Sequence, residues 1–181
     1  MLSATLDALR DEGFGGLTVE DVALRSGVHR TTIHRRWPSR PALVADALLE
    51  VSAAQVPVPN TGSLRSDLRR FAREVRDAIS TPLANAVVAA LAQPTADQEL
   101  VGVSRRFWES RFAATRAIVD RAVERGEIAK RTDARFVIEA LGGPIWFRTF
   151  VIGQPVDDRF LERVVDTVIA GVNQSVKGRA M

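Results

Sequence analysis

The sequence contains no cysteine, so disulfide bonds and thiolate metal sites are both excluded. Histidine is almost as scarce: the chain has only His29 and His34, five positions apart, a spacing at which two side chains share a helical face poorly. We therefore predict no metal site and no other cofactor. No Ser-His-Asp arrangement can form away from these two histidines, and no paired carboxylates lie in the apolar C-terminal part of the chain. These absences predict that the protein is not an enzyme.

Long apolar runs are missing as well. Nowhere do about 18 apolar residues follow one another without a charge, so no membrane-spanning helix is predicted. The first ten residues, MLSATLDALR, lack the basic start and apolar run of a secretory signal, and we predict a cytoplasmic protein. Strand-like alternation, glycine-rich phosphate loops and internal repeats do not stand out either, which favours an all-α fold.

The sequence does contain a local concentration of positive charge. The net charge of +3 is modest for 181 residues, so the basic character depends on where the charges lie. No acidic side chain occurs between Asp21 and Asp46. Five arginines fall in this interval, namely Arg25, Arg30, Arg35, Arg36 and Arg40. The interval is therefore predicted to form a cationic surface.

Residues 18–37, TVEDVALRSGVHRTTIHRRW, predict two short helices joined by a tight turn. Thr18 stands before the first helix as a capping hydroxyl, with Asp21 three positions later, close to the pattern of a capping box. Gly27 can adopt the positive φ that a sharp bend requires. The second helix ends before Pro38, because proline has no N–H to donate. This second helix is expected to bury Val28, Thr32 and Ile33.

The remaining side chains of the second helix are expected to point away from the core: His29, Arg30, Thr31, His34 and Arg35. A helix-turn-helix places its second helix in the major groove of DNA. There arginine, histidine and threonine reach base edges, while flanking arginines hold phosphates. We therefore predict that the protein binds double-stranded DNA.

The run of residues 13–43, GFGGLTVEDVALRSGVHRTTIHRRWPSRPAL, resembles the N-terminal domain of the tetracycline-repressor (TetR) family of bacterial regulators. The resemblance implies that Thr18 caps its helix near a phosphate, that residues 29–35 form the recognition helix, and that Arg40 holds another phosphate. The DNA-binding residues predicted in this way are Thr18, His29, Arg30, Thr31, Thr32, His34, Arg35, Arg36 and Arg40.

Two positions depart from the family pattern. His29 stands where members usually have a small hydroxyl residue, which weakens the expected cap of the recognition helix. His34 stands where they usually have a tyrosine that contacts DNA.

Residues 56–63, VPVPNTGS, combine prolines with glycine and polar residues and predict a domain junction. We expect a helix-turn-helix domain of three helices over residues 1–55 and a helical effector-binding and dimerisation domain over residues 56–181. About nine helices are expected in all. Those outside the helix-turn-helix cover residues 2–12, 39–54, 63–79, 83–93, 97–125, 133–152 and 157–175. Gly142, Gly143 and Pro144 should weaken or kink the eighth helix.

A second set of arginines lies on the helix over residues 63–79: Arg65, Arg69, Arg70, Arg73 and Arg76. Asp67, Glu74 and Asp77 are interleaved with them. Charges of both signs on one helix are typical of a solvated face, so we predict that these arginines do not extend the DNA-binding surface.

The last two predicted helices have wide apolar faces. Pairing them with the same helices of a second copy would bury this surface and would present two recognition helices to a palindromic site. The predicted interface residues are Ile145, Arg148, Ile152, Phe160, Val164, Val165, Val168 and Ile169. The TetR resemblance implies the same homodimer. The alternative is that these faces belong only to the core of one chain.

The C-terminal block also contains large side chains that could enclose an effector pocket beside the Gly-Gly-Pro break: Phe71, Val75, Val87, Leu91, Trp108, Phe112 and Trp146. Such a pocket would accept a small apolar or aromatic molecule. A filled core is the alternative, and the resemblance favours the pocket. The sequence thus predicts a repressor released from DNA by an effector. The alternatives are a DNA-binding dimer that senses nothing and a protein-interaction module.

Overall fold

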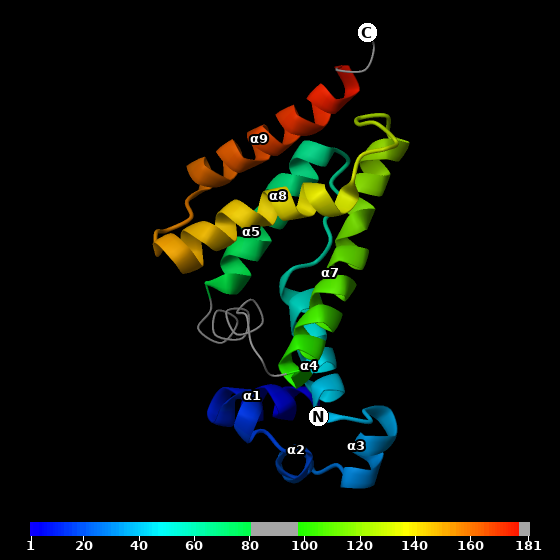
Figure 1. Cartoon of the computed structure of the whole chain (residues 1–181), viewed down its shortest axis with the longest axis vertical. Coiled ribbons are helices and arrows are strands. Elements are labelled where there is room, and N and C mark those ends of the chain that lie inside the picture. The colour runs from blue at the N-terminus through cyan, green and yellow to red at the C-terminus, as the bar shows by residue number, and fades with distance from the viewer. Residues whose placement is uncertain (81–97, 178–181) are drawn as a thin grey trace. The chain divides into compact units, whose positions relative to one another are not determined.

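The computed structural model describes residues 1–80 and 98–177, and over these residues the chain forms eight α-helices and one π-helical turn, without a strand (Figure 1). The elements are α1 (Leu2–Gly16), α2 (Val19–Ser26), α3 (Arg30–Arg36), α4 (Arg40–Gln55), α5 (Leu64–Ile79), α7 (Gln98–Glu124), α8 (Ala134–Trp146), the π turn η1 (Phe147–Ile152) and α9 (Asp158–Lys177). The predicted all-α fold with an N-terminal helix-turn-helix is confirmed. The helix predicted over residues 83–93 lies outside the described residues.

Two compact units divide the chain. Among the described residues, unit 1 holds residues 1–54 and 98–111, and unit 2 holds residues 55–80 and 112–177. The first part of α7 is thus grouped with the N-terminal helices in unit 1. The physical reason is that Val103 and Phe107 of α7 are buried in the core of unit 1. With 27 residues, α7 is about 40 Å long, enough to contribute to two cores.

The core of unit 1 forms around α1, α2 and α4, and its fully buried side chains include Leu17, Val22, Ile33 and Leu43. At Gly13, φ is 67° and the helical path of α1 is interrupted, at the position where the sequence predicts that this helix ends. A 2.8 Å hydrogen bond also stabilises this unit: Trp37 Nε1 donates it to Asp46 Oδ2, and the indole ring is buried.

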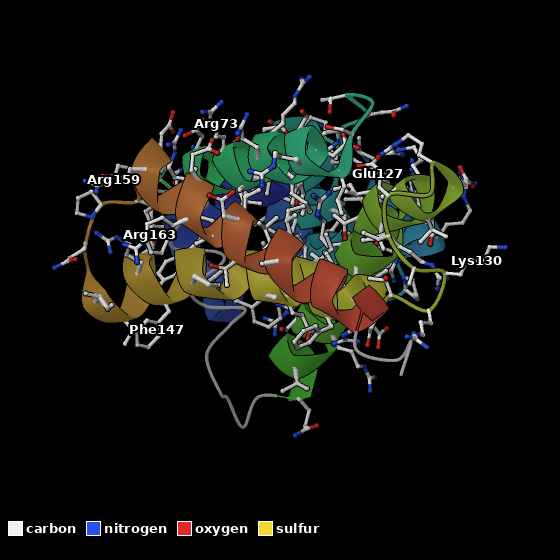
Figure 2. All side chains as sticks on the ribbon, turned by 90° about the horizontal axis from the view of Figure 1, so that it is seen from above. Arg73, Glu127, Lys130, Phe147, Arg159 and Arg163 are labelled. Atoms are coloured by element: carbon white, nitrogen blue, oxygen red, sulfur yellow. The ribbon has the colours of Figure 1, made fainter. Side chains whose placement is uncertain are left out.

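The core of unit 2 forms where α9 packs against both α5 and α8. Figure 2 shows α9 lying between these two helices, with Arg73 on the α5 side and Phe147 on the α8 side. The fully buried side chains at these contacts include Leu68 of α5, Leu141 and Ile145 of α8, and Leu161 and Val165 of α9. Each helix therefore places one apolar stripe in a shared interior.

Ion pairs join α5 to α9 along the edge of this core. Arg65 Nη1 lies 2.5 Å from Asp166 Oδ1, Arg69 Nε lies 2.6 Å from Glu162 Oε1, Arg76 Nη1 lies 2.6 Å from Asp158 Oδ1, and Arg73 Nη2 lies 3.0 Å from Asp158 Oδ2. We call these seven residues the α5–α9 ladder. The hydrogen bond from Arg76 and the nearby charge of Arg73 lower the pKa of Asp158. These arginines therefore serve contacts within unit 2.

The prediction of a solvated face is wrong for Asp67. This carboxylate is 0% exposed, and its Oδ1 accepts hydrogen bonds from Thr61 N at 2.6 Å and from Thr61 Oγ1 at 2.7 Å. Its other oxygen lies 3.7 Å from Arg125 Nη2. Nearby, Glu127 Oε2 accepts a 2.7 Å hydrogen bond from Leu64 N. The end of the junction segment is thus held to unit 2 by buried and partly buried carboxylates, which can stabilise backbone N–H groups at the start of α5.

The Gly-Gly-Pro stretch does not break α8, which continues through Pro144 to Trp146. The predicted weakening instead takes the form of the π turn η1 directly after it, which ends at Gly153 with φ 68°. Proline withholds one N–H from the helical ladder, and π turns accommodate such changes in hydrogen-bonding register.

Candidate nucleic-acid interface

The helix-turn-helix is assembled by local hydrogen bonds and one glycine. Thr18 caps α2, because its Oγ1 accepts a 3.1 Å hydrogen bond from Asp21 N. At Gly27, φ is 66°, and the chain turns there into α3. His29 caps α3, its Nδ1 accepting from Thr31 N at a long 3.5 Å. An imidazole therefore occupies the capping position, with a weaker hydrogen bond than a hydroxyl usually makes.

Helix α3 has one buried side and one wide exposed side. Ile33 is fully buried, and Val28, just before the helix, is half-buried. Thr32 was predicted to face inward, and this is wrong: its side chain is exposed, while its neighbour Ile33 is fully buried. The exposed side carries His29, Arg30, Thr31, Thr32, His34, Arg35 and Arg36. All seven were predicted to bind DNA, and their exposure leaves them accessible to a groove.

The predicted cationic surface is smaller in space than in the sequence, because carboxylates of α1 and α2 neutralise part of it. Arg25 points to Asp11 and Asp21, at 2.6 Å and 2.7 Å. These hydrogen bonds, the one to Asp11 first, raise the pKa of Arg25 above its ordinary value. Arg30 forms a 2.6 Å ion pair with Glu20. The acid-free interval in the sequence is therefore not acid-free in the fold.

The other arginines of this region have different partners. The guanidinium of Arg36 lies 4.7 Å from the centre of the Trp37 ring, a cation–π contact at the end of α3. The guanidinium of Arg40 lies 4.6 Å from the centre of the Phe14 ring, and its Nη1 donates to Gly15 O at 3.3 Å. Arg40 is half-buried, and its contacts tie the start of α4 to the end of α1. Its predicted contact with phosphate remains a prediction.

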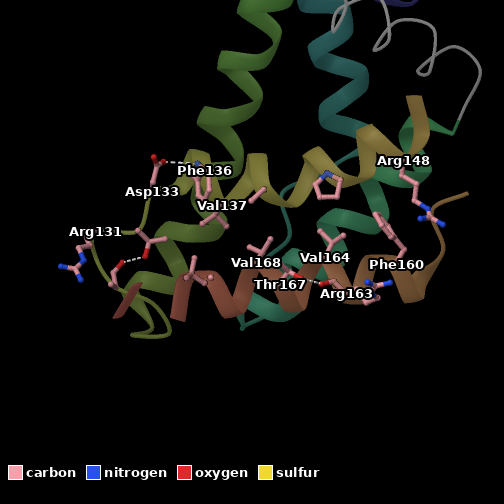
Figure 3. A pocket seen from close by; sticks show the side chains of 16 residues that line it. Arg131, Asp133, Phe136, Val137, Arg148, Phe160, Arg163, Val164, Thr167 and Val168 are labelled. Atoms are coloured by element: carbon pink, nitrogen blue, oxygen red, sulfur yellow. Dashed lines mark hydrogen bonds between the residues drawn. The ribbon is translucent and has the colours of Figure 1, made fainter. Parts of the chain in front are cut away.

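A groove of about 840 Å³ lies between α8 and α9 in unit 2 (Figure 3). Val137 of α8 and Val164 and Val168 of α9 line its apolar part, while Arg148, Phe160 and Arg163 lie at one end (Figure 3). Four of the predicted interface residues are among its lining residues: Arg148, Phe160, Val164 and Val168. Ile152 is exposed outside it, and Ile169 is half-buried.

Two predicted interface residues are fully buried in the single chain. Ile145 and Val165 are both 0% exposed, so they belong to the core of unit 2, and their place in an interface remains a prediction. Three apolar side chains that the prediction missed are far more exposed: Phe136 at 66%, Phe147 at 55% and Val151 at 69%. The helical period alone did not distinguish these two groups: Ile145 lies in the same apolar stretch as the three exposed side chains, and Val165 lies on the apolar side of α9.

The predicted effector pocket is not tested by the structure. Val87 and Leu91 lie outside the described residues, and Val75 of α5 is half-buried. The described aromatic side chains have neighbours within their own unit. Phe107 contacts Trp108 at 5.0 Å between ring centres, the guanidinium of Arg135 lies 4.6 Å from the Phe112 ring centre, Trp146 contacts Phe150 at 4.7 Å, and Phe71 is buried. The pocket therefore remains a prediction.

The local features of unit 1 define the class of protein. A capped helix, a glycine turn and an exposed basic helix together make a helix-turn-helix DNA-binding protein. Within residues 1–80 and 98–177, no three His, Asp or Glu side chains are grouped so that they could hold a metal ion. No helix in the same part of the chain is long and apolar enough to cross a membrane.

Comparison with known proteins gives the family. Residues 1–47 match the family described as "Bacterial regulatory proteins, tetR family", and residues 58–168 match "Tetracyclin repressor-like, C-terminal domain". The chain is 34% identical over 172 residues to the HTH-type transcriptional regulator AqdR of Rhodococcus erythropolis. The aligned region covers 94% of this chain and 83% of AqdR. It is 33% identical over 174 residues to the uncharacterized HTH-type transcriptional regulator Mb1581 of Mycobacterium bovis, covering 93% and 84% of the two chains.

A solved structure gives the same result. The fold is similar to that of the TetR family transcription regulator SCO0332, with a TM-score of 0.75, 28% identity, and coverage of 94% of this chain and 95% of that one. The chain belongs to the TetR family, and it is a DNA-binding transcriptional regulator. The resemblance stated from residues 13–43 is thereby confirmed.

Proposed function

We propose that this protein is a repressor that binds a palindromic operator as a homodimer and leaves it when a small apolar or aromatic effector binds. The observation that carries the proposal is the exposed side of α3, which presents basic and hydroxyl side chains on a helix held in place by Ile33. Because the partner is chromosomal DNA, we place the protein in the cytoplasm, and we assign it no catalytic role.

The residues of the proposed DNA interface fall into two groups, those that would contact bases and those that would contact phosphates. Arg30, Thr31 and His34 lie on the exposed side of α3 and would reach base edges, while Arg35 and Arg36 in its last turn would hold phosphates. Thr18 lies at the N-terminus of α2, where backbone N–H groups favour an anion, so a phosphate would sit there.

A second copy is the proposed occupant of the groove between α8 and α9. Phe136, Phe147 and Val151 are each more than half exposed, and exposed apolar side chains of this size favour association. A two-fold axis would place the same surface on both subunits and would direct two copies of α3 to one face of a duplex. The half-sites would then be about one helical turn, or a multiple of it, apart.

The proposed effector acts by binding one spacing of the two α3 helices better than the other, since equal affinity for both would shift nothing. Its proposed pocket involves the aromatic side chains of unit 2, with Phe112 and Trp146 half-buried and so able to contact a ligand. A panel of small aromatic and aliphatic compounds can be added to the protein bound to DNA. The expected result is release by one class of compound, and no release by that compound from a folded Phe112→Ala variant.

The DNA-binding step is tested by fluorescence anisotropy with DNA from the region upstream of the protein's own gene, at several salt concentrations. Arg35→Ala and Arg36→Ala should each weaken binding and reduce the salt slope by about 1 for each phosphate that the variant no longer neutralises. Arg116→Ala is the matched control, because Arg116 is exposed on α7 in unit 2 and pairs with Asp120. Unchanged binding in both α3 variants would contradict the placement of α3 on DNA.

The dimer is tested by light scattering at micromolar concentration. Phe147→Asp should shift the protein toward monomer, because a carboxylate would be buried without a partner in the proposed contact. Leu24→Asp is the matched control, since Leu24 is an exposed apolar residue of α2 in unit 1. A monomeric wild type would contradict the proposed homodimer and, with it, the palindromic operator. The same oligomeric state in both variants would contradict the proposed interface. A dimer that binds DNA and responds to no compound would favour the alternative of a constitutive regulator.

A further inference from the structure

We infer that Glu20 is a specificity-determining positioning residue, which holds Arg30 of α3 in one direction and thereby selects the base pair that Arg30 reads. The inference rests on the proposed function, because Arg30 must face the bases. Glu20 lies in the first turn of α2, and Arg30 is the first residue of α3. Nothing in their separation along the chain indicates that they meet.

The Arg30 side chain is held from two sides. Its Nη1 lies 2.6 Å from Glu20 Oε1, and its Nε donates a 3.2 Å hydrogen bond to His34 Nε2. His34 is one turn further along α3, so one brace comes from the same helix and the other from α2. The capped start of α2 and the Gly27 turn fix the positions of the two helices relative to each other. The guanidinium therefore has a defined direction before DNA arrives.

Stability does not explain this pair. Arg30 and Glu20 have side chains that are 58% and 56% exposed, and ion pairs this exposed contribute little to folding. A carboxylate beside a DNA-binding helix also repels phosphates, so it weakens binding to DNA of any sequence. A pair that adds little stability and opposes general affinity fits a role in selectivity, because restricting a long side chain in advance lowers the entropy lost on binding.

The other arginines of α3 differ from Arg30. Arg35 and Arg36 form no ion pair with the carboxylates of the described residues, and Arg36 rests on the Trp37 ring. Their charges are therefore suited to phosphates, which tolerate a range of side-chain directions. In this helix, Arg30 is the arginine that is oriented by a carboxylate.

The remaining donors of Arg30 indicate which base it reads. A guanidinium has five N–H groups; the hydrogen bond to His34 engages Nε, and the ion pair with Glu20 lies on the side of Nη1. The N–H groups of Nη2 take part in neither contact, and donors on the terminal nitrogens of a guanidinium match O6 and N7 of guanine in the major groove. Guanine is the base that we expect opposite Arg30.

The test uses the full-length protein and a binding site selected from a random DNA pool. Each base pair of that site is then changed in turn, and the dissociation constants of four proteins are measured by anisotropy: wild type, Glu20→Gln, Arg30→Ala and the double variant. Arg30→Ala should reduce the preference for one G·C pair by roughly 5- to 150-fold, the range of a single specific base contact. Glu20→Gln should reduce the preference at the same pair by several-fold, and it should change nothing further in the Arg30→Ala background.

Glu12→Gln provides the matched control. Glu12 is an exposed glutamate of unit 1 that pairs with Arg25 at 3.1 Å, so its substitution removes the same charge without touching α3. It should leave every base preference unchanged. Circular dichroism of each variant checks that the helices are intact.

Three outcomes would overturn the inference. Glu20→Gln could raise affinity for all sequences alike, as Glu12→Gln does, with the base preference retained, and Glu20 would then act only through its charge. The preference could change equally with and without Arg30, and Glu20 would then act on DNA directly. A wild-type protein that selects no sequence would overturn the proposed function together with the inference, whereas in the first two outcomes DNA binding itself is retained.

Discussion

Replacing the buried Asp67 with alanine would remove one of the strongest fixed contacts of unit 2. The substitution leaves the N–H and the hydroxyl of Thr61 without the acceptor that each now has at 2.6 Å and 2.7 Å. Hydrogen bonds to a charged group contribute roughly 1.5–3 kcal/mol each. Thr61 is itself exposed, so water can reach its donors in the variant, and part of the loss is regained. We therefore expect the free energy of unfolding of unit 2 to fall by about 2–3 kcal/mol.

Urea unfolding at one fixed protein concentration measures this loss. The chain has three tryptophans, of which Trp37 and Trp108 belong to unit 1 and Trp146 to unit 2. In a background with Trp37→Phe and Trp108→Phe, the fluorescence of Trp146 reports on unit 2. Asp77→Ala is the control, because Asp77 lies on the same helix, is 67% exposed and pairs with Arg76. Its loss should be below about 1 kcal/mol.

Equal losses for the alanine variants of Asp67 and Asp77 would refute the reasoning. They would mean that burial and hydrogen bonding do not distinguish two aspartates of α5. Asp67→Asn should fall between wild type and Asp67→Ala, since the amide oxygen can still accept from Thr61 but carries no charge.

Three further predictions concern other parts of the chain. Gly27→Ala should destabilise unit 1 by roughly 1 kcal/mol in urea unfolding, through its positive φ alone, because no atom lies within 4 Å of the added Cβ. Thr18→Ala should cost roughly 1 kcal/mol by the same measurement, and Thr18→Ser should restore most of it. The pKa of Asp158 is lowered by Arg76 and Arg73, so its stabilising contribution is present above the ordinary carboxyl pKa and is lost as pH falls through the folded value. Thermal unfolding between about pH 6 and pH 2.5 should therefore show a larger loss for wild type than for Asp158→Asn.

Local signals explain why the helix-turn-helix could be predicted. A capping hydroxyl at Thr18, a turn glycine at Gly27 and a proline after Trp37 each act over three or four residues, and tertiary packing does not override them. The exception is Thr32, which was assigned to the buried side of a helix only seven residues long. Ile33 of this short helix is fully buried, whereas the neighbouring hydroxyl of Thr32 is exposed.

Contacts between distant segments explain what could not be predicted. The burial of Asp67 depends on the path of the junction segment, and its charge alone suggested a solvated position. The ion pair of Glu20 with Arg30 depends on the angle between α2 and α3. In η1, hydrogen bonds span five residues and not four, so Phe147 and Ile152 both become exposed, whereas the usual helical period assigns them to different faces. No pattern based on 3.6 residues per turn contains this information.

Ionic strength should affect this regulator in two places, the ion pairs of the α5–α9 ladder and the arginines of α3. The arginines of the ladder are between 23% and 46% exposed, so dissolved ions reach them. At about 1 M salt the screening length of roughly 3 Å is comparable to the distances within the ion pairs. The same ions compete with the arginines of α3 for phosphate. Osmotic conditions that concentrate salt around the protein should therefore weaken the ion pairs between α5 and α9 in unit 2 and lower the affinity for DNA at the same time.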